Sequence, residues 1–271
     1  MEVGVIRAVV CGAAGRMGGR IIALMKEAGD FELAGAVERP GHPALGKDAG
    51  EAAGVGKAGV PITAVLGQVA MDGQVGFDFT APEAAIANIG KAAEAGLAMV
   101  VGTTGMKPEA LDRARELGRR IPLLIAPNMS VGVNVMYTLL AQAAAKLGDD
   151  YDVEICEIHH HFKADAPSGT AAKMAQVIAG ALGRDLERVG VYGRKGMVGE
   201  RKPQEIGVHA LRGGDIAGEH TVIFAGMGER IEIVHRAHSR DNFARGALRA
   251  ARWLVGRPPG VYDMGDVLGL K

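Results

Sequence analysis

The stretch that decides the fold is residues 7–18, which read R-A-V-V-C-G-A-A-G-R-M-G. A short apolar run typical of a buried strand leads directly into Gly12, Gly15 and Gly18, and a helical pattern begins inside this glycine segment. Glycines between a strand and a helix let backbone N–H groups approach a pyrophosphate at the helix N-terminus. The spacing G-x-x-G-x-x-G is a variant of the dinucleotide-binding fingerprint. The alternative is an ordinary strand–helix turn.

The same alternation of short apolar runs and helical patterns continues to about residue 130. Near-continuous apolar strands separated by helices predict an α/β fold, with a parallel sheet covered on both faces. The predicted strands are Arg7–Cys11, Phe31–Val37, Gly76–Thr80, Leu97–Val101 and Pro122–Ile125, and the predicted helices are Arg16–Ala28, Pro82–Ala95 and Lys107–Arg120.

The pattern changes after Ser130, where helices no longer separate every pair of strands. This part is predicted to be a central α+β domain with a mixed or antiparallel sheet that is open on one face. Its predicted helices are Val131–Lys146 and Thr170–Leu182, and its predicted strands are Val153–Ile158, Glu205–Leu211, Glu219–Phe224 and Arg230–Ala237. A last helix, Asn242–Val255, is expected to rejoin the first domain. The expected domains are therefore 1–130, completed by 241–271, and 131–240.

Composition narrows the class of protein. The 31 Lys and Arg residues balance 31 Asp and Glu residues, so no charge excess points to a nucleic-acid or anionic-membrane partner. No apolar run approaches the ~20 residues that span a bilayer, and the N-terminus lacks the features of a signal peptide. Cys11 and Cys156 lie far apart in strand-like contexts and are expected to be reduced thiols. We therefore expect a cytoplasmic protein.

The residues around the glycine segment extend the cofactor hypothesis. Glu38 follows Gly18 by about twenty residues, where an acid binds the ribose hydroxyls of NADH. Its neighbour Arg39 can pair with the 2′-phosphate of NADPH, so either cofactor is expected to bind; a solvated strand end is the alternative. Loops at the ends of later strands lie at the edge where parallel sheets bind ligands. The candidate cofactor residues are Gly12, Ala13, Ala14, Gly15, Arg16, Met17, Gly18, Glu38, Arg39, Gly102, Thr103, Thr104, Ala126, Pro127, Asn128 and Met129.

A second site is expected in the segment Glu157–Thr170, which reads E-I-H-H-H-F-K-A-D-A-P-S-G-T. Imidazole titrates near neutrality and Lys163 adds a cation, so the segment suits acid–base work on an anionic substrate. Ser168, Gly169 and Thr170 open a predicted helix, whose N-terminal amides can receive a carboxylate. A metal site and a solvated polar turn are the alternatives. No metal is expected, because alternation leaves only two of the three histidines on one side and no further ligand pair is near in sequence.

Several strings resemble the 4-hydroxy-tetrahydrodipicolinate reductase family, formerly called dihydrodipicolinate reductase, and they cover essentially the whole chain. The matching strings are G-A-A-G-R-M-G at 12–18, the pair Glu38-Arg39, D-F-T-x-P at 78–82, V-G-T-T-G at 101–105, N-M-S-V-G-V-N at 128–134, E-I-H-H-H-F-K-A-D-A-P-S-G-T-A at 157–171, Arg212–His220 and Tyr262-Asp263-Met264. The departures are Phe162, where a polar residue is also known, and the step Arg212-Gly213. Neither touches a residue with an expected role.

The resemblance implies a Rossmann-type cofactor domain, a central substrate domain and a homotetramer assembled through the open sheet face. It implies NAD(P)H-dependent reduction of a cyclic dicarboxylate in diaminopimelate and lysine biosynthesis, with loss of water. By the same analogy His159 is the acid/base and Lys163 the proton donor, and either could deliver the proton. Carboxylate binding would fall to His160, Lys163, Ser168, Gly169 and Thr170. The alternatives are another imine or amino-acid dehydrogenase of this fold and a non-catalytic NAD-sensing protein.

Overall fold

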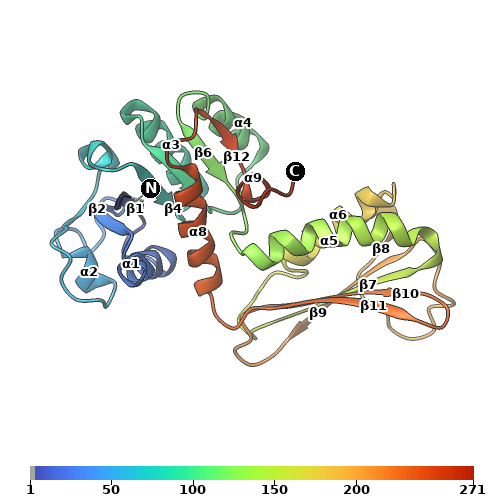
Figure 1. Ribbon diagram of the computed structural model, residues 1–271. Coiled ribbons are helices and arrows are strands. Elements are labelled where there is room, and N and C mark those ends of the chain that lie inside the picture. Colours follow the sequence, from blue (N-terminus) through green and yellow to red (C-terminus); the bar gives the residue numbers. More distant parts are fainter. Residues whose placement is uncertain (1–3) are drawn as a thin grey trace. The chain divides into compact units, whose positions relative to one another are not determined.

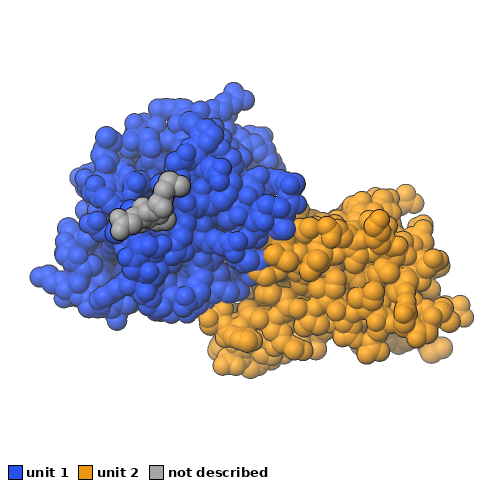
Figure 2. Space-filling view, in the orientation of Figure 1, with its two compact units in different colours: residues 1–131, 241–271 blue, residues 132–240 orange. Residues whose placement is uncertain are grey.

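A computed structural model describes residues 4–271 and divides into two compact units. Unit 1 contains residues up to Val131 together with Asp241–Lys271, and unit 2 contains Gly132–Arg240 (Figure 2). Unit 1 is thus built from both ends of the chain. No helix of the described residues is long and apolar enough to cross a membrane.

Unit 1 contains a seven-stranded sheet whose strand pairs are all parallel (Figure 1). Its strands are β1 (Ile6–Cys11), β2 (Phe31–Val37), β3 (Ile62–Thr63), β4 (Val75–Asp78), β5 (Ala98–Val101), β6 (Pro122–Ile125) and β12 (Gly260–Tyr262). The order β12-β6-β5-β4-β1-β2-β3 places β1 and β4 side by side, at the point where the strand order reverses. In doubly wound sheets a ligand binds outside the carboxyl ends of the strands at this point. The α/β, Rossmann-type prediction is confirmed.

Helices cover both faces of this sheet. On one face, α1 (Arg16–Ala28) and α8 (Asp241–Leu254) pack in a core with alternate strand residues such as Val10 and Phe77. On the other face, α3 (Pro82–Ala95) and α4 (Pro108–Leu117) pack on intervening residues such as Val9. Shorter elements are α2 (Ala49–Ala52), the 3₁₀ turns η1 (Leu66–Gln68) and η2 (Ala70–Asp72), and α9 (Met264–Leu268).

Unit 2 contains a five-stranded mixed sheet with the order β11-β10-β7-β9-β8. Its strands are β7 (Asp152–His159), β8 (Gly190–Val191), β9 (Ile206–Arg212), β10 (Glu219–Ala225) and β11 (Arg230–Arg236). The pairs involving β10 are antiparallel, whereas β7–β9 and β8–β9 are parallel. The remaining elements are α5 (Val131–Leu147), η3 (Gly148–Asp150), α6 (Gly169–Ala181) and α7 (Leu186–Val189).

Helices α5 and α6 pack on one face of this sheet. Alternate residues of the central strand β7, such as Val153 and Ile155, are buried in that core together with Met174 of α6. The opposite face carries half-buried residues of β7 and apolar side chains that are 45% exposed at Leu211 and 43% exposed at Val234. The predicted mixed sheet with one open face is therefore present.

Candidate active site

The glycine turn between β1 and α1 is tight and leaves no room for side chains at two of its three glycines. Gly12 has φ +72°, and a Cβ at Gly18 would lie 2.1 Å from the Gly12 carbonyl oxygen, so neither position accepts a side chain without movement. Gly15 is the N-cap of α1 and supplies no side-chain cap. The first-turn amides of a helix have no partners within that helix and point outward. The turn therefore fits a phosphate-bearing cofactor whose oxygens accept these bonds.

A buried carboxylate organises the loops beside this turn. Asp78, at the end of β4, is 0% exposed and accepts hydrogen bonds from Thr80, Asn88 and Thr103. Through Thr103 Oγ1, at 3.0 Å, it fixes the predicted cofactor segment 102–104. The segment 126–129 follows the neighbouring strand β6, and Asn128 Oδ1 accepts from the Ser130 amide at 2.9 Å. Asp78 is a site residue that the sequence analysis did not single out.

The predicted ribose-binding acid lies directly against the glycine turn. Glu38 comes one residue after β2, and its Oε2 atom accepts a hydrogen bond from the Ala14 amide at 3.3 Å. Its other oxygen accepts from the amide of Arg39, whose side chain is exposed. The structure therefore brings Glu38 and the glycine turn together.

In unit 2, a buried carboxylate lies behind the predicted acid/base. The Glu157 side chain is 0% exposed, and its Oε2 atom lies 2.6 Å from Nδ1 of His159. Arg212 donates to both oxygens of Glu157, at 2.9 and 3.0 Å, and the Ser168 amide donates at 2.9 Å. Burial raises the pKa of Glu157, but the hydrogen bonds from Arg212, His159 and Ser168 outweigh it, so the pKa lies below its usual value. Glu157 is therefore an anion, and His159 Nδ1 must be the donor.

Arg212 also fixes the loop that carries Lys163. Its guanidinium donates to the carbonyl oxygen of Asp165 at 2.6 Å and to that of Lys163 at 3.4 Å. The ammonium of Lys163 donates to both carboxylate oxygens of Asp165 at 2.8 Å. This bond from Lys163 holds the pKa of Asp165 below its usual value. Asp165 therefore orients Lys163, and a substrate anion must share or displace this pair.

His160 has one ring nitrogen in use. Its Nε2 lies 3.3 Å from the Arg240 guanidinium, and its Nδ1 is buried with no hydrogen-bond partner among residues 4–271. Burial and the charge of Arg240 lower the pKa of His160 and favour the neutral ring. Because Arg240 is always a donor, Nε2 accepts and Nδ1 carries the proton. That leaves one N–H donor for which a substrate oxygen is a suitable acceptor.

The start of α6 combines a cap with a tight polar network. Ser168 is the N-cap, and its Oγ accepts from the Ala171 amide at 3.1 Å and lies 3.2 Å from Nε2 of His220. Burial and the neighbouring histidines lower the pKa of His220 to about 4, so its ring is neutral. Thr170 hydrogen-bonds with the Tyr137 side chain. A Cβ at Gly169 would have no described atom within 4 Å, so this backbone is open to a ligand.

Three residues around the histidine loop were not predicted as site residues from the sequence: Glu157, Arg212 and His220. The strand register brings them together. Glu157 is opposite His220 across the β7–β10 pair, and His159 is paired with Arg212 across β7–β9. The only sequence signal was that all three fall within the matching strings, because contacts such as that between Glu157 and Arg212, 55 residues apart, leave no local pattern.

Comparisons with known proteins agree along the whole chain. Residues 6–129 match the model of the N-terminal part of dihydrodipicolinate reductase, and residues 132–268 match that of its C-terminal part. A relative from Syntrophus aciditrophicus named 4-hydroxy-tetrahydrodipicolinate reductase is 56% identical over 98% of this chain and 99% of its own length. A relative of the same name from Citrifermentans bemidjiense is 57% identical over 98% of this chain and its full length.

A solved structure has the same fold. Dihydrodipicolinate reductase from Paenisporosarcina sp. TG-14, bound to dipicolinate, aligns with a TM-score of 0.76 and 24% identity, over 96% of this chain and 97% of that one. A probable dehydrogenase from Thermotoga maritima aligns with a TM-score of 0.60 and 13% identity, over 97% of this chain and 92% of that one. The two matched segments and the high identity over nearly the full length show that this chain belongs to the dihydrodipicolinate reductase family.

Proposed function

We propose that the chain reduces 4-hydroxy-tetrahydrodipicolinate to tetrahydrodipicolinate in diaminopimelate and lysine biosynthesis. One substrate, one NADH or NADPH and one proton give the product, the oxidised cofactor and water. Family membership supports the reaction. The observation that carries the site assignment is that the buried Glu157 carboxylate contacts both His159 Nδ1 and the amide of Ser168, the N-cap of α6.

The cofactor site would be the carboxyl edge of the unit 1 sheet. First-turn amides of α1, from Arg16 to Gly18, would receive the pyrophosphate, and Glu38 would accept hydrogen bonds from the adenosine ribose. The segments 102–104 and 126–129 would support the nicotinamide end. When bound, the cofactor supplies the hydride. The tight turn is consistent with this role, because a Cβ at Gly15 would lie 3.1 Å from the Gly12 carbonyl oxygen and would press on the turn.

The substrate site would be the histidine loop and the start of α6. The carboxylates would be received by the His160 Nδ1–H, the Lys163 ammonium and the Ser168, Gly169 and Thr170 segment. Proton transfer would involve His159 Nε2 and the Lys163 ammonium. A protonated leaving hydroxyl departs as water, which balances the charge that the hydride brings. His159 is 12% exposed and Lys163 18% exposed at the side chain, so both are shielded and still accessible.

A homotetramer would assemble through the open face of the unit 2 sheet. Leu211 and Val234 expose apolar side chains there, and exposed apolar surface on an otherwise paired sheet indicates an interface. Light scattering should then give four times the mass of the 28.1 kDa chain. A monomer would contradict this part without affecting the activity.

The reaction is tested by following the absorbance of the reduced nicotinamide while the unstable substrate is generated enzymatically in the cuvette. NADH or NADPH should be consumed only when the protein and the complete substrate-generating system are both present. A related dehydrogenase would instead consume cofactor with an imine or amino-acid substrate, and a sensing protein would bind NADH without consuming it. Either result would overturn the proposal.

A further inference from the structure

The carboxylate of Glu157 is surrounded by donors. Its Oε2 atom faces His159 Nδ1 at 2.6 Å and Arg212 Nη1 at 2.9 Å. Its Oε1 atom faces the Ser168 amide at 2.9 Å and Arg212 Nη2 at 3.0 Å. The side chain has no exposed surface, so water cannot replace any of these partners. A buried anion with four well-placed donors is fixed in one orientation.

We propose that Glu157 is the positioning residue of the reaction: it holds His159 in the tautomer with the proton on Nδ1, so that Nε2 is the nitrogen that exchanges a proton with the substrate. The inference rests on the proposed role of His159. Without an acceptor at Nδ1, a neutral imidazole can place its proton on either nitrogen and can rotate. The carboxylate removes both freedoms, and it stabilises the ring when Nε2 is also protonated.

Two further residues, Gly218 and His220, lie next to the His159 ring. Gly218 precedes β10 and has φ +149°. A Cβ at this position would lie 2.9 Å from His159 Nε2. His220 packs edge-on to the same ring with centroids 5.3 Å apart. The ring is therefore held by Glu157 at Nδ1 and contacted by His220, and the glycine at 218 keeps a side chain away from Nε2.

The same carboxylate connects the proton-exchanging ring to the substrate anchor. Its second oxygen binds the amide of Ser168, the N-cap of α6. Movement of His159 and movement of the carboxylate-binding helix terminus are therefore coupled through one rigid group. Distances between the substrate ring and the catalytic imidazole need such rigidity, because small misplacements cost large factors in rate.

An amide cannot replace this carboxylate. Gln at 157 would have one acceptor oxygen and one NH₂ group in place of the two carboxylate oxygens. Each of those oxygens faces an Arg212 N–H and one further donor, either the Ser168 amide or His159 Nδ1. In one orientation the NH₂ opposes the Ser168 amide. In the other it opposes His159 Nδ1 and drives the ring toward the tautomer that accepts at Nδ1. The imidazole can become an acceptor at Nδ1, whereas the Ser168 amide can only donate, so the second orientation is favoured. Glu157→Gln is thus nearly isosteric and still removes the orienting interaction.

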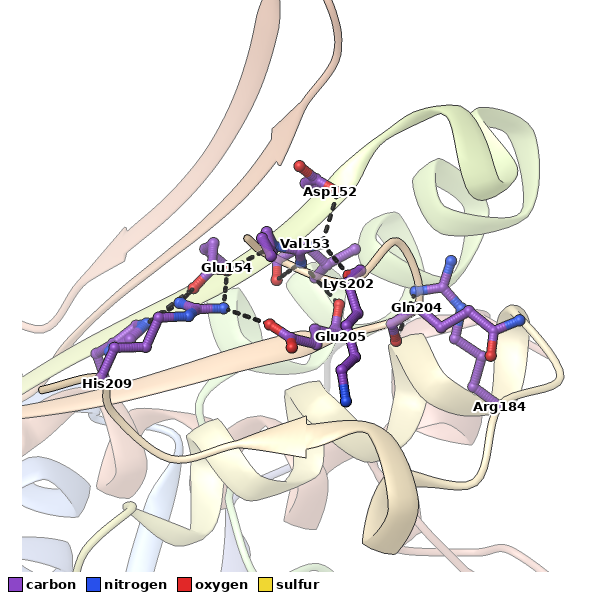
Figure 3. Close-up of polar contacts among 10 residues, drawn as sticks. Asp152, Val153, Glu154, Arg184, Lys202, Gln204, Glu205 and His209 are labelled. Carbon is purple, nitrogen blue, oxygen red and sulfur yellow. Dashed lines mark hydrogen bonds and ion pairs between the residues drawn. The ribbon is translucent and has the colours of Figure 1, made fainter. Parts of the chain in front are cut away.

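The chain contains a matched control on the same strand. Glu154 lies on the opposite face of β7, and its carboxylate also receives a histidine nitrogen, His209 Nε2 at 2.8 Å, and two arginines (Figure 3). Burial raises the pKa of Glu154, but the hydrogen bonds from Arg194, His209 and Arg201 have the larger effect and lower it to about 2. Glu154→Gln therefore disrupts a similar cluster of charged residues on the same strand, but one that does not contact His159.

The experiment is ¹⁵N NMR of the histidine rings, at a pH where His159 is neutral, with the His159 signals assigned by their loss in His159→Asn. Two-bond couplings identify which nitrogen carries the proton. Wild type and Glu154→Gln should both show the Nδ1–H form, and Glu157→Gln should show its loss. Turnover should fall on the order of 10²-fold or more in Glu157→Gln, and far less in Glu154→Gln. If Glu157→Gln does not fold, Glu157→Asp replaces it and should keep Nδ1–H with a smaller loss in turnover.

Retention of the Nδ1–H form in Glu157→Gln would overturn the proposal, as would full turnover despite a changed tautomer. A change of the His159 tautomer in Glu154→Gln as well would also overturn it, because it would reflect general disruption of the sheet. The ring measurement needs no substrate. Failure of the proposed reaction would therefore appear as inactive wild-type protein with an intact Nδ1–H signal, which is distinguishable from failure of the positioning role.

Discussion

Gly18 lies directly against the backbone of Gly12, and a Cβ added to Gly18 would be 2.1 Å from the Gly12 carbonyl oxygen. This contact holds the start of α1 close to the end of β1. Gly18→Ala should therefore lower the free energy of unfolding by about 1–3 kcal/mol, as overpacking does, and should weaken NADH binding. Chemical denaturation and cofactor titration measure the two effects.

The control is the next residue. A Cβ at Gly19 would be 3.8 Å from its nearest neighbours, an ordinary contact, so Gly19→Ala should be neutral or stabilise α1 by up to about 1 kcal/mol. Equal destabilisation by both variants would mean that the close approach at Gly18 is not what restricts the turn.

Lys163→Ala should lower turnover by a factor on the order of 10² to 10⁴, the usual cost of losing a general acid, and should also weaken substrate binding. Lys173→Ala removes an exposed lysine from α6 and should change neither quantity appreciably. Steady-state kinetics at saturating substrate separates the two roles of Lys163. Near-normal turnover in Lys163→Ala would show that Lys163 binds the substrate and does not donate the proton.

Gly169→Ala tests the carboxylate anchor with little risk to the fold. The added methyl would have no described atom within 4 Å, so it occupies the space proposed for the ligand. Pyridine-2,6-dicarboxylate should compete with the substrate, bind more tightly than pyridine-2-carboxylate, and lose about tenfold in affinity, or ~1.4 kcal/mol, in the variant.

Gly180→Ala is the matched control, because it adds a methyl to open space at the other end of α6. Calorimetric titration should show that Gly180→Ala binds pyridine-2,6-dicarboxylate with the affinity of the wild type. Unchanged dicarboxylate affinity in Gly169→Ala, or equal binding of the monocarboxylate, would contradict an anchor at this helix terminus.

Arg39→Ala should weaken NADPH far more than NADH, because only NADPH carries the phosphate that Arg39 can bind. In the wild type, the charges of Glu38 and Arg39 partly offset each other at that phosphate, so the preference should stay within about tenfold. Michaelis constants for both cofactors measure this. Equal weakening of the two would show that Arg39 contacts the adenine instead.

The buried His220 makes stability depend on pH. Its pKa of about 4 in the folded chain lies below the ~6.5 of an unfolded histidine, so the unfolded state binds more protons between these values. Stability should be unaffected by this group above pH ~6.5 and should fall as the pH drops toward 4, by up to about 1.4 kcal/mol per pH unit. Denaturation curves of wild type and His220→Gln should converge over that window. Parallel curves would mean that His220 does not titrate as described.

Long regular elements could be predicted from the sequence, whereas elements defined by a partner could not. The helix Arg16–Ala28 has the predicted bounds because an amphipathic pattern ends at Gly29, in the left-handed conformation. The helix predicted at Lys107–Arg120 is shorter, Pro108–Leu117. Strands of two or three residues, such as β3 and β12, have no alternation to detect and exist only through pairing.

The candidate site divides in the same way. His159, Lys163 and Ser168 lie within ten consecutive residues, from the end of β7 to the start of α6, so local chemistry identified the segment. The partners of that loop come from another strand, because the parallel register of β7 and β9 sets Arg212 beside His159. A single Arg or Glu in a predicted strand is expected to be solvent-exposed, and only the fold shows that Glu157 is buried.

The division of unit 1 between the two ends of the chain affects synthesis. A ribosome delivers residues in order, and helix α8, which covers one face of the unit 1 sheet, is among the last to leave the exit tunnel. Until then the nascent sheet keeps Val10 and Phe77 without that cover, while all of unit 2 has already been made. A ribosome that stalls before Asp241 therefore leaves one apolar face of this sheet without helix α8, which exposes surface that favours aggregation.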